Sequence, residues 1–342
     1  MQLFETEKRA RLYICGLGAF DMKKILLIIY IIVICMLLAF IYLKEKQNKD
    51  AHKAMIKENY YMDFHSDYFL ESKYSGIGNF EVSQVKIETG EDILKHYWIW
   101  YPSELEEKEE KYPMIIVTNA SNMAAYNYEP FFKRLASWGF IVVGNEDKQA
   151  GKGDSTSKTL DFMLESNHNN ESLFVNKVDE EKIGIVGYSQ GGAGVIRAVT
   201  EFENSNKYKA LFTGSAAYAL LSKNLGWEYD ISKIKIPYFM TAGTGRSDDT
   251  GVKDIEKEFG GVAPLSSLVE NYNGISEDVF KIRARAVGAE HSDMLACSDG
   301  YMTAWLLYQL QGDEEAGRVF QGEEAEILQN RNWQDIEINE SK

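Results

Sequence analysis

Short apolar runs rich in β-branched residues recur along the chain, and segments with helical spacing of their apolar positions lie between them. The runs expected to form buried strands are residues 112–117, 140–143, 183–186, 210–214 and 236–243, and residues 280–287, which include three basic side chains, are expected to form a further strand. Strands that alternate with helices predict a mostly parallel central sheet with helices on both faces. The chain is therefore expected to have an α/β fold.

The segments between and after these strands predict five helices, at residues 126–138, 155–166, 193–199, 254–272 and 301–310. Residues 80–89 and 96–101 are expected to form a first, antiparallel pair of strands. Only about twenty residues separate the strands at 210–214 and 236–243, which is short for anything but a connection with a little local structure. We therefore expect no large lid domain and an open site.

A different pattern stands near the N-terminus, where residues 25–43 are uncharged and flanked by Lys23, Lys24 and Lys44. A helix of about twenty apolar residues crosses a bilayer. A cleaved signal peptide is the competing interpretation, but the run is longer than a usual signal core and no A-x-A-like site follows it. We predict one transmembrane helix that acts as an uncleaved signal anchor.

The expected organisation is a leader (residues 1–24), a transmembrane anchor (25–43), a polar tether (44–75) and an α/β domain (76–342). Met22 is a more ordinary start than Met1, so both starts stay open. Basic residues flank the span on both sides, with a slight excess before it. This excess favours a single-pass protein whose α/β domain lies outside the cytoplasm.

The composition and charge of the chain limit the classes of function that it can have. The chain of 342 residues is 45% hydrophobic and can bury one large core. Residues 58–342 hold 27 basic and 47 acidic side chains, and this acidic surface excludes nucleic acid as a partner. Cys297 is the one thiol of the predicted domain, so no internal disulfide forms there. Histidines and cysteines are too few and scattered for a metal site, and no cofactor is expected. The oligomeric state is left open.

The strongest chemical signal is the sequence GYSQG at residues 187–191, a match to G-x-S-x-G. The strand at 183–186 precedes it and the helix at 193–199 follows it. In this context the motif is a nucleophile elbow, a strained turn that exposes a serine hydroxyl at the edge of a sheet. The alternative is a Gly-rich turn with an ordinary N-cap serine. We predict that Ser189 is a nucleophile.

Chain order selects its partners, because in enzymes with this elbow an acid and then a histidine follow the serine. His291 is the one histidine beyond Ser189, in a loop after the strand at 280–287. Asp248 and Asp249 both follow the strand at 236–243. We favour Asp248 as the residue that orients His291, with Asp249 in reserve. The backbone amide of Gln190 is expected to form half of an oxyanion hole, and the loop at 118–123 the other half.

Five segments together resemble a known family: PMIIVTNAS, FFKRLASWGFIVVGNED, GYSQGG, IPYFMTAGTGRSDD and GAEHSDML, within about residues 80–312. They are similar to the dienelactone hydrolase-like and polyester hydrolase (cutinase-like) branch of the α/β-hydrolase superfamily, which includes the platelet-activating-factor acetylhydrolases. LASWGF resembles the LASHGF segment of the polyester hydrolases. Counted back from it, Ser121 falls on the family's oxyanion-hole residue. Ala120 departs from the glycine that is common before that residue.

The resemblance implies an α/β-hydrolase fold and a serine hydrolase that acts on carboxylic esters through an acyl-enzyme, and the apolar span at 25–43 makes it a membrane-anchored one. The substrate would be a small-molecule, lipid-like or polymeric ester, and the N-terminal helix would bind the membrane. One alternative is an amidase or peptidase with the same Ser-His-Asp triad. Another is a non-catalytic surface binding protein that retains the fold. Nothing in the residues identifies the acyl or alcohol group.

Overall fold

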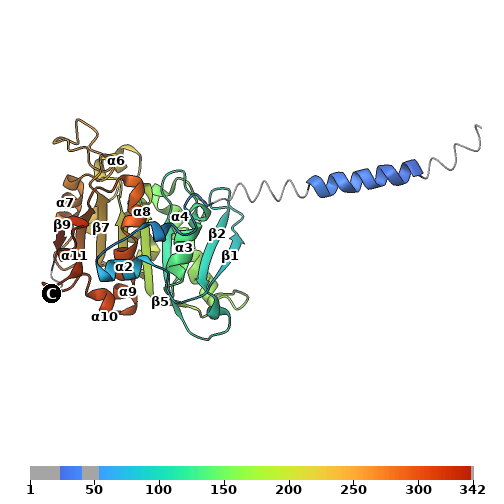
Figure 1. The fold of residues 1–342 in the computed structure, drawn as a ribbon, viewed down its shortest axis with the longest axis horizontal. Helices are drawn as coiled ribbons and strands as arrows, with labels where there is room; N and C mark the ends of the chain where they lie inside the picture. Colours follow the sequence, from blue (N-terminus) through green and yellow to red (C-terminus); the bar gives the residue numbers. More distant parts are fainter. Residues whose placement is uncertain (1–23, 41–53, 340–342) are drawn as a thin grey trace, which may run out of the picture. The chain divides into compact units, whose positions relative to one another are not determined.

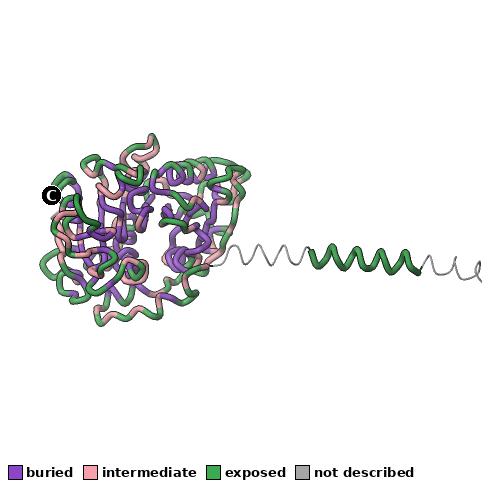
Figure 2. The backbone as a smooth tube through the Cα atoms, turned by 90° about the horizontal axis from the view of Figure 1, so that it is seen from above, coloured by how far each residue is buried: buried purple, intermediate pink, exposed green. Residues whose placement is uncertain are grey.

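The computed structural model describes residues 24–40 and 54–339. The chain divides into two units, residues 1–53 and 54–342. In the first unit, residues 24–40 form a helix whose side chains are all exposed (Figure 2). Among the residues that the structure describes, no helix combines the length and the apolar character needed to cross a membrane. Part of the predicted span at 25–43, and most of the predicted leader, lie outside the described residues.

The second unit is built on one nine-stranded sheet in the order β1-β2-β4-β3-β5-β6-β7-β8-β9 (Figure 1). The strands are β1 (Val82–Glu88), β2 (His96–Pro102), β3 (Tyr112–Thr118), β4 (Ile141–Gly144), β5 (Val178–Tyr188), β6 (Tyr208–Gly214), β7 (Tyr238–Gly243), β8 (Lys281–Ala286) and β9 (Trp333–Ile338). All neighbours from β4 to β8 pair in parallel. The predicted mostly parallel α/β sheet is confirmed.

Antiparallel strands complete the two sides of this sheet. β1 and β2 form a hairpin whose second strand pairs with β4. At the other side β9 pairs with β8 and extends the sheet, with a register irregularity between Arg283 and Arg285. The carboxyl ends of β3 to β8 all lie at one edge of the sheet, which is where ligands and catalytic residues gather in open α/β sheets.

The helices are α2 (Phe69–Ser75), α3 (Glu129–Ala136), α4 (Asp154–His168), α5 (Gln190–Glu201), α6 (Ala219–Asn224), α7 (Leu265–Gly274), α8 (Met294–Cys297), α9 (Asp299–Gln311), α10 (Glu314–Gly317) and α11 (Glu326–Gln329). They cover both faces of the sheet, because successive strand residues point to opposite sides. Ile115 packs in one core cluster with side chains of α2, α3 and α9. Its neighbours Met114 and Ile116 pack in the other, with side chains of α4, α5 and α7.

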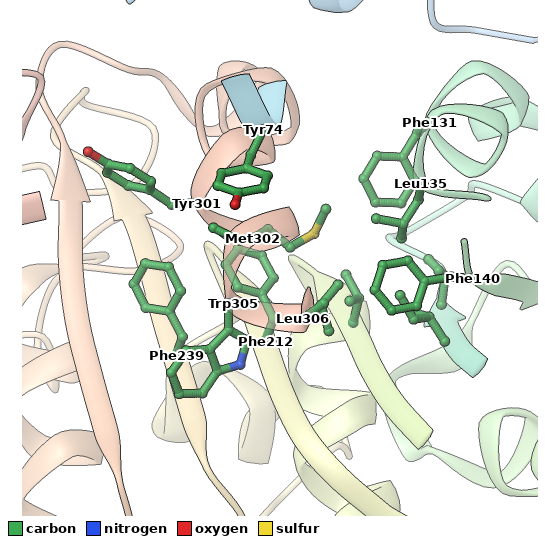
Figure 3. Packing of buried hydrophobic residues seen from close by; sticks show 14 of the residues in the cluster. Tyr74, Phe131, Leu135, Phe140, Phe212, Phe239, Tyr301, Met302, Trp305 and Leu306 are labelled. Atoms are coloured by element: carbon green, nitrogen blue, oxygen red, sulfur yellow. The ribbon is translucent and has the colours of Figure 1, made fainter. Parts of the chain in front are cut away.

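Aromatic side chains fill the core on the α9 face (Figure 3). Trp305 of α9 is fully buried, and its indole N–H donates to the backbone oxygen of Leu211 in β6 at 3.1 Å. Its ring lies 5.8 Å from that of Phe239 in β7, at an angle of 57°. Because a buried indole N–H needs an acceptor, this bond lets a large side chain pack against the sheet without a polar penalty.

Residues 54–75, which were expected to be part of the polar tether, belong to the second unit. The unit includes the 3-10 helix η1 (Tyr60–Asp63) and α2, and Tyr60, Leu70 and Tyr74 are buried. Glu71 is also fully buried and accepts a hydrogen bond from the indole N–H of Trp333 in β9 at 2.5 Å. Because α2 is short and includes this buried glutamate, its buried positions do not form a recognisable apolar pattern in the sequence.

A buried ion pair ties this N-terminal segment to α3 and α9. Arg134 and Asp299 are each 1% exposed, and the Nη2 and Oδ1 atoms lie 2.5 Å apart. The hydroxyl of Tyr60 donates to Asp299, and Arg134 Nη1 donates to the carbonyl oxygen of Tyr74 at 2.9 Å. The arginine links three elements that are far apart in sequence.

Asp299→Asn should lower the free energy of unfolding by about 3–5 kcal/mol, because it leaves the guanidinium of Arg134 buried without its counter-charge. Urea unfolding followed by tryptophan fluorescence measures the loss. The matched control is Glu315→Gln, which breaks a half-exposed pair with Lys73 and should cost less than about 1 kcal/mol. Equal losses for the two variants would contradict a stabilising role for the buried pair.

Candidate active site

The sequence GYSQG forms a tight turn between β5 and α5. Ser189 has φ 56° and ψ −122°, a strained backbone conformation, and it is the residue between the last of β5 and the first of α5. A Cβ on Gly187 would lie 2.3 Å from the backbone oxygen of Gly191, and one on Gly191 would lie 2.4 Å from that of Thr118. Both flanking glycines are therefore required by close backbone contacts. The side chain of Ser189 is half-buried at the carboxyl edge of the sheet.

Two loops at the same edge bring an acid and a histidine together. Asp248 follows β7 and His291 follows β8, and these strands are parallel neighbours. Asp248 Oδ1 lies 2.6 Å from His291 Nδ1. Asp248 is fully buried, and its Oδ2 accepts from the amide of Gly243 at 2.7 Å and from the hydroxyl of Ser215. These donors fix the position of the carboxylate, and its other oxygen holds the imidazole by Nδ1.

Asp249, the reserve candidate, faces a different partner. Its Oδ2 lies 2.6 Å from Nη1 of Arg285, whose side chain is 8% exposed. The same oxygen accepts from the amide of Leu265, at the start of α7. The structure thus brings Asp248, and not Asp249, to His291. Asp249 instead joins the loop after β7, here called the acid loop, to β8 and α7.

The loop after β6 contacts both Ser189 and Asp248. The amide of Ala217 donates to the backbone oxygen of Ser189 at 3.2 Å, and Ser215 in the same loop binds Asp248. Within the described residues Ser189 and His291 share no hydrogen bond. Hydrogen bonds between catalytic groups are often long in a site without substrate and shorten when substrate binds.

The amides of Gln190 and Ser121 are the two predicted donors of the oxyanion hole. Gln190 is the first residue of α5, and Ser121 lies in the exposed loop after β3. Within residues 24–40 and 54–339 neither amide has a hydrogen-bond acceptor. Two free N–H groups, one of them at a helix N-terminus, suit an oxyanion.

The alanine before Ser121 causes no strain. The left-handed residue of this loop is Asn122, with φ 61°, whereas the φ of Ala120 is not positive. Asparagine tolerates this region better than most residues. The amide of Ala120 donates to the hydroxyl of Tyr128 at 3.0 Å, which fixes the loop from below.

Sequence reasoning missed the residues that hold the loop after β8, which carries His291 and is here called the histidine loop. The amide of His291 donates to Oγ of Ser247 at 2.8 Å, and the amide of Ser247 donates to Glu290 Oε2 at 2.9 Å. The amide of Gly245 donates to the carbonyl oxygen of Ala289 at 2.8 Å. These bonds fasten the loop after β8 to the loop after β7. Serines and a glutamate in polar loops give no sequence signal for such a role.

Other ionisable groups lie elsewhere. His168 Nε2 lies 2.7 Å from Oε1 of Glu180, on an exposed surface. Nδ1 of His96 lies 2.7 Å from Oε1 of Glu146. In the described part of the chain no three His, Cys, Asp or Glu side chains are grouped so that they could hold a metal ion.

Cys297 lies on α8, soon after His291, and its thiol should be unreactive at neutral pH. Burial, and next the negative charge of Asp293, raise its pKa to about 11. Since only the thiolate alkylates, iodoacetamide at pH 8 should modify it roughly a hundredfold more slowly than a free cysteine. The rate should rise with pH until about pH 11. Mass spectrometry on a Cys15→Ser, Cys35→Ser chain measures this. Rapid labelling at pH 8, or loss of activity in Cys297→Ser, would contradict the expectation.

Comparison with known proteins agrees with the architecture. Residues 71–237 match the family model described as PET hydrolase-like. The matched segment includes Ser121, Ser189 and Gln190 and ends before Asp248 and His291. A search among curated proteins finds no match to the chain. The resemblance to the polyester hydrolase branch is confirmed over residues 71–237, where the chain is similar to the PET hydrolase-like proteins.

Proposed function

We propose that the protein is a serine hydrolase that cleaves carboxylic esters through an acyl-enzyme. The observation that supports this most is the bond between Asp248 and His291 at the same sheet edge as the elbow of Ser189. The PET hydrolase-like match favours an ester, and a polymeric one is among the candidates. The connection from β6 to β7 holds only α6 and the short 3-10 helix η6 (Ile231–Lys233), so a bulky substrate has access.

In the proposed reaction Oγ of Ser189 attacks the ester carbonyl carbon, and Nε2 of His291 takes the hydroxyl proton. Asp248 stabilises the imidazolium that forms. The amides of Gln190 and Ser121 donate to the oxyanion, and one such donor is worth about 3 kcal/mol. His291 then gives its proton to the leaving alcohol. A water molecule, deprotonated by the same histidine, attacks the acyl-enzyme and releases the acid.

An ester panel tests this proposal. We expect turnover of neutral nitrophenyl esters of short, medium and long acyl chains, and much slower turnover of the matched anilides. The dependence on chain length would define the acyl group. Anilide turnover at a comparable rate would favour an amidase with the same residues. Binding of the esters without turnover would favour a non-catalytic binding protein.

We also propose that residues 25–43 anchor the chain in a membrane, with the catalytic unit outside the cytoplasm. The sequence of this span is the support: it is uncharged, and lysines flank it. Protein that stays in the membrane pellet after alkaline carbonate, and is digested by protease added to intact cells, is the expected result. Release by carbonate would contradict the anchor, and protection from protease would contradict the orientation.

A further inference from the structure

Ser215 occupies an unusual position directly after β6. Its φ is 47°, in the left-handed region that favours glycine, and it is 1% exposed. Its amide donates to the carbonyl oxygen of Thr241 at 2.8 Å, so the loop is held against β7. If the turn alone mattered, glycine would suit this backbone better than serine. The side chain therefore has a reason to be there.

That reason is Asp248. The hydroxyl of Ser215 donates to Oδ2 of Asp248, because a carboxylate can only accept. The same oxygen accepts from the amide of Gly243, and the other oxygen faces His291. Ser215 is thus the one side-chain donor to the oxygen of Asp248 that points away from the histidine, within the described residues. Removing it would free the carboxylate to rotate.

We infer that Ser215 is a positioning residue, which fixes the carboxylate of Asp248 and moderates its charge towards His291. The inference rests on the proposed serine hydrolase function. Its loop also bonds the elbow, since the amide of Ala217 donates to the backbone oxygen of Ser189. One loop therefore sets the position of the acid relative to the nucleophile.

The electrostatic effect has a definite sign. A hydroxyl that donates to a carboxylate disperses its negative charge. Without that donor Asp248 attracts the imidazolium more strongly, so His291 binds its proton more tightly and the acidic limb of the rate profile moves to higher pH. The other charged groups of the two loops are Glu290 and Asp293 after β8, and Arg246 and Asp249 after β7, where Asp249 is paired with Arg285.

The test compares Ser215→Ala and Ser215→Gly in the full chain. Both remove the hydroxyl, but glycine also relieves the backbone at φ 47°. We expect kcat for a neutral ester to fall about tenfold in both variants, the scale of one hydrogen bond to a charged group, with KM unchanged. The acidic limb of kcat/KM should move up by about half a pH unit in both. Urea unfolding reports any loss of fold separately.

An unshifted acidic limb in both variants would overturn the inference. So would a loss of kcat in Ser215→Ala that Ser215→Gly does not share, since the backbone would then be its cause. These results would leave the proposed function intact if Ser189→Ala is inactive. Full activity of Ser189→Ala would instead end the proposed function, whatever Ser215 does.

Discussion

Ser189→Ala should lower kcat for a neutral ester by about 10⁵-fold or more, to the residual rate that substrate binding and the oxyanion donors still support. The methyl group has no hydroxyl to attack the carbonyl, and the other hydroxyl of the GYSQG turn, that of Tyr188, is buried 3.2 Å from Oγ of Ser298. Alanine keeps a Cβ at φ 56°, so the backbone should change little. Initial rates measured with purified variant and wild-type protein give the ratio.

A control separates chemistry from folding. Ser205 lies in the 3-10 helix η5 (Glu203–Lys207), in the connection from α5 to β6. Ser205→Ala should keep wild-type turnover, and Ser189→Ala should unfold at the wild-type urea midpoint. Turnover by Ser189→Ala within tenfold of wild type would show that the nucleophile is another group.

Asp248→Asn should lower kcat by about 10⁴-fold, while Asp249→Asn should leave it within a few-fold of wild type. Asparagine can present an N–H to Nδ1 of His291, which favours the wrong tautomer and removes the charge that stabilises the imidazolium. Asp249→Asn breaks the pair with Arg285 instead. We expect that variant to lose about 1–3 kcal/mol of unfolding free energy. Steady-state kinetics and urea unfolding distinguish the two.

The same pair of variants can contradict the assignment. A severe loss of kcat in Asp249→Asn with a mild one in Asp248→Asn would make Asp249 the acid. Equal and small losses would mean that neither carboxylate orients the histidine, and the bond at 2.6 Å between Asp248 and His291 would have no catalytic role.

The sequence predicts well those parts of the molecule whose structure is determined by residues close together in the chain. The strands from β3 to β7 contain apolar runs that are buried on both faces, so each is visible by itself, whereas β8 (KIRARA) carries three basic side chains. The elbow around Ser189 is visible in the sequence because the contact that requires Gly187 is with Gly191, four residues later. The contact that requires Gly191 is with Thr118, which is distant in the sequence. His291 is found by chain order, as the one histidine beyond the elbow.

The helix predicted at residues 254–272 is shorter in the structure, where α7 is Leu265–Gly274. The residues before it form turns, and Gly261 adopts φ 100° with its Cα packed against the acid loop: a Cβ there would lie 2.1 Å from the backbone oxygen of Asp248. The amide of Ala263 donates to that same oxygen at 3.1 Å. The contact with Asp248, distant in sequence, decides the local structure here.

β9 escaped prediction for a related reason. The residues after 311 look like a polar surface segment, and β9 is half-polar because it lies at the edge of the sheet. Asp335 has φ 53° and interrupts the alternation of the strand. Its partner strand, β8, lies about fifty residues earlier. The choice between Asp248 and Asp249 depends likewise on Ser215, Gly243 and Arg285, which only the folded chain brings together.

The central claim is that Ser189 and His291 act together as nucleophile and base. Incubation with a fluorophosphonate probe, digestion and mass spectrometry of the labelled peptide test it most directly. We predict one adduct, on Ser189, that is absent in Ser189→Ala and forms at least about a hundredfold more slowly in His291→Ala, because the hydroxyl then lacks its base. An adduct on another residue, or undiminished labelling of Ser189 in His291→Ala, would contradict the account.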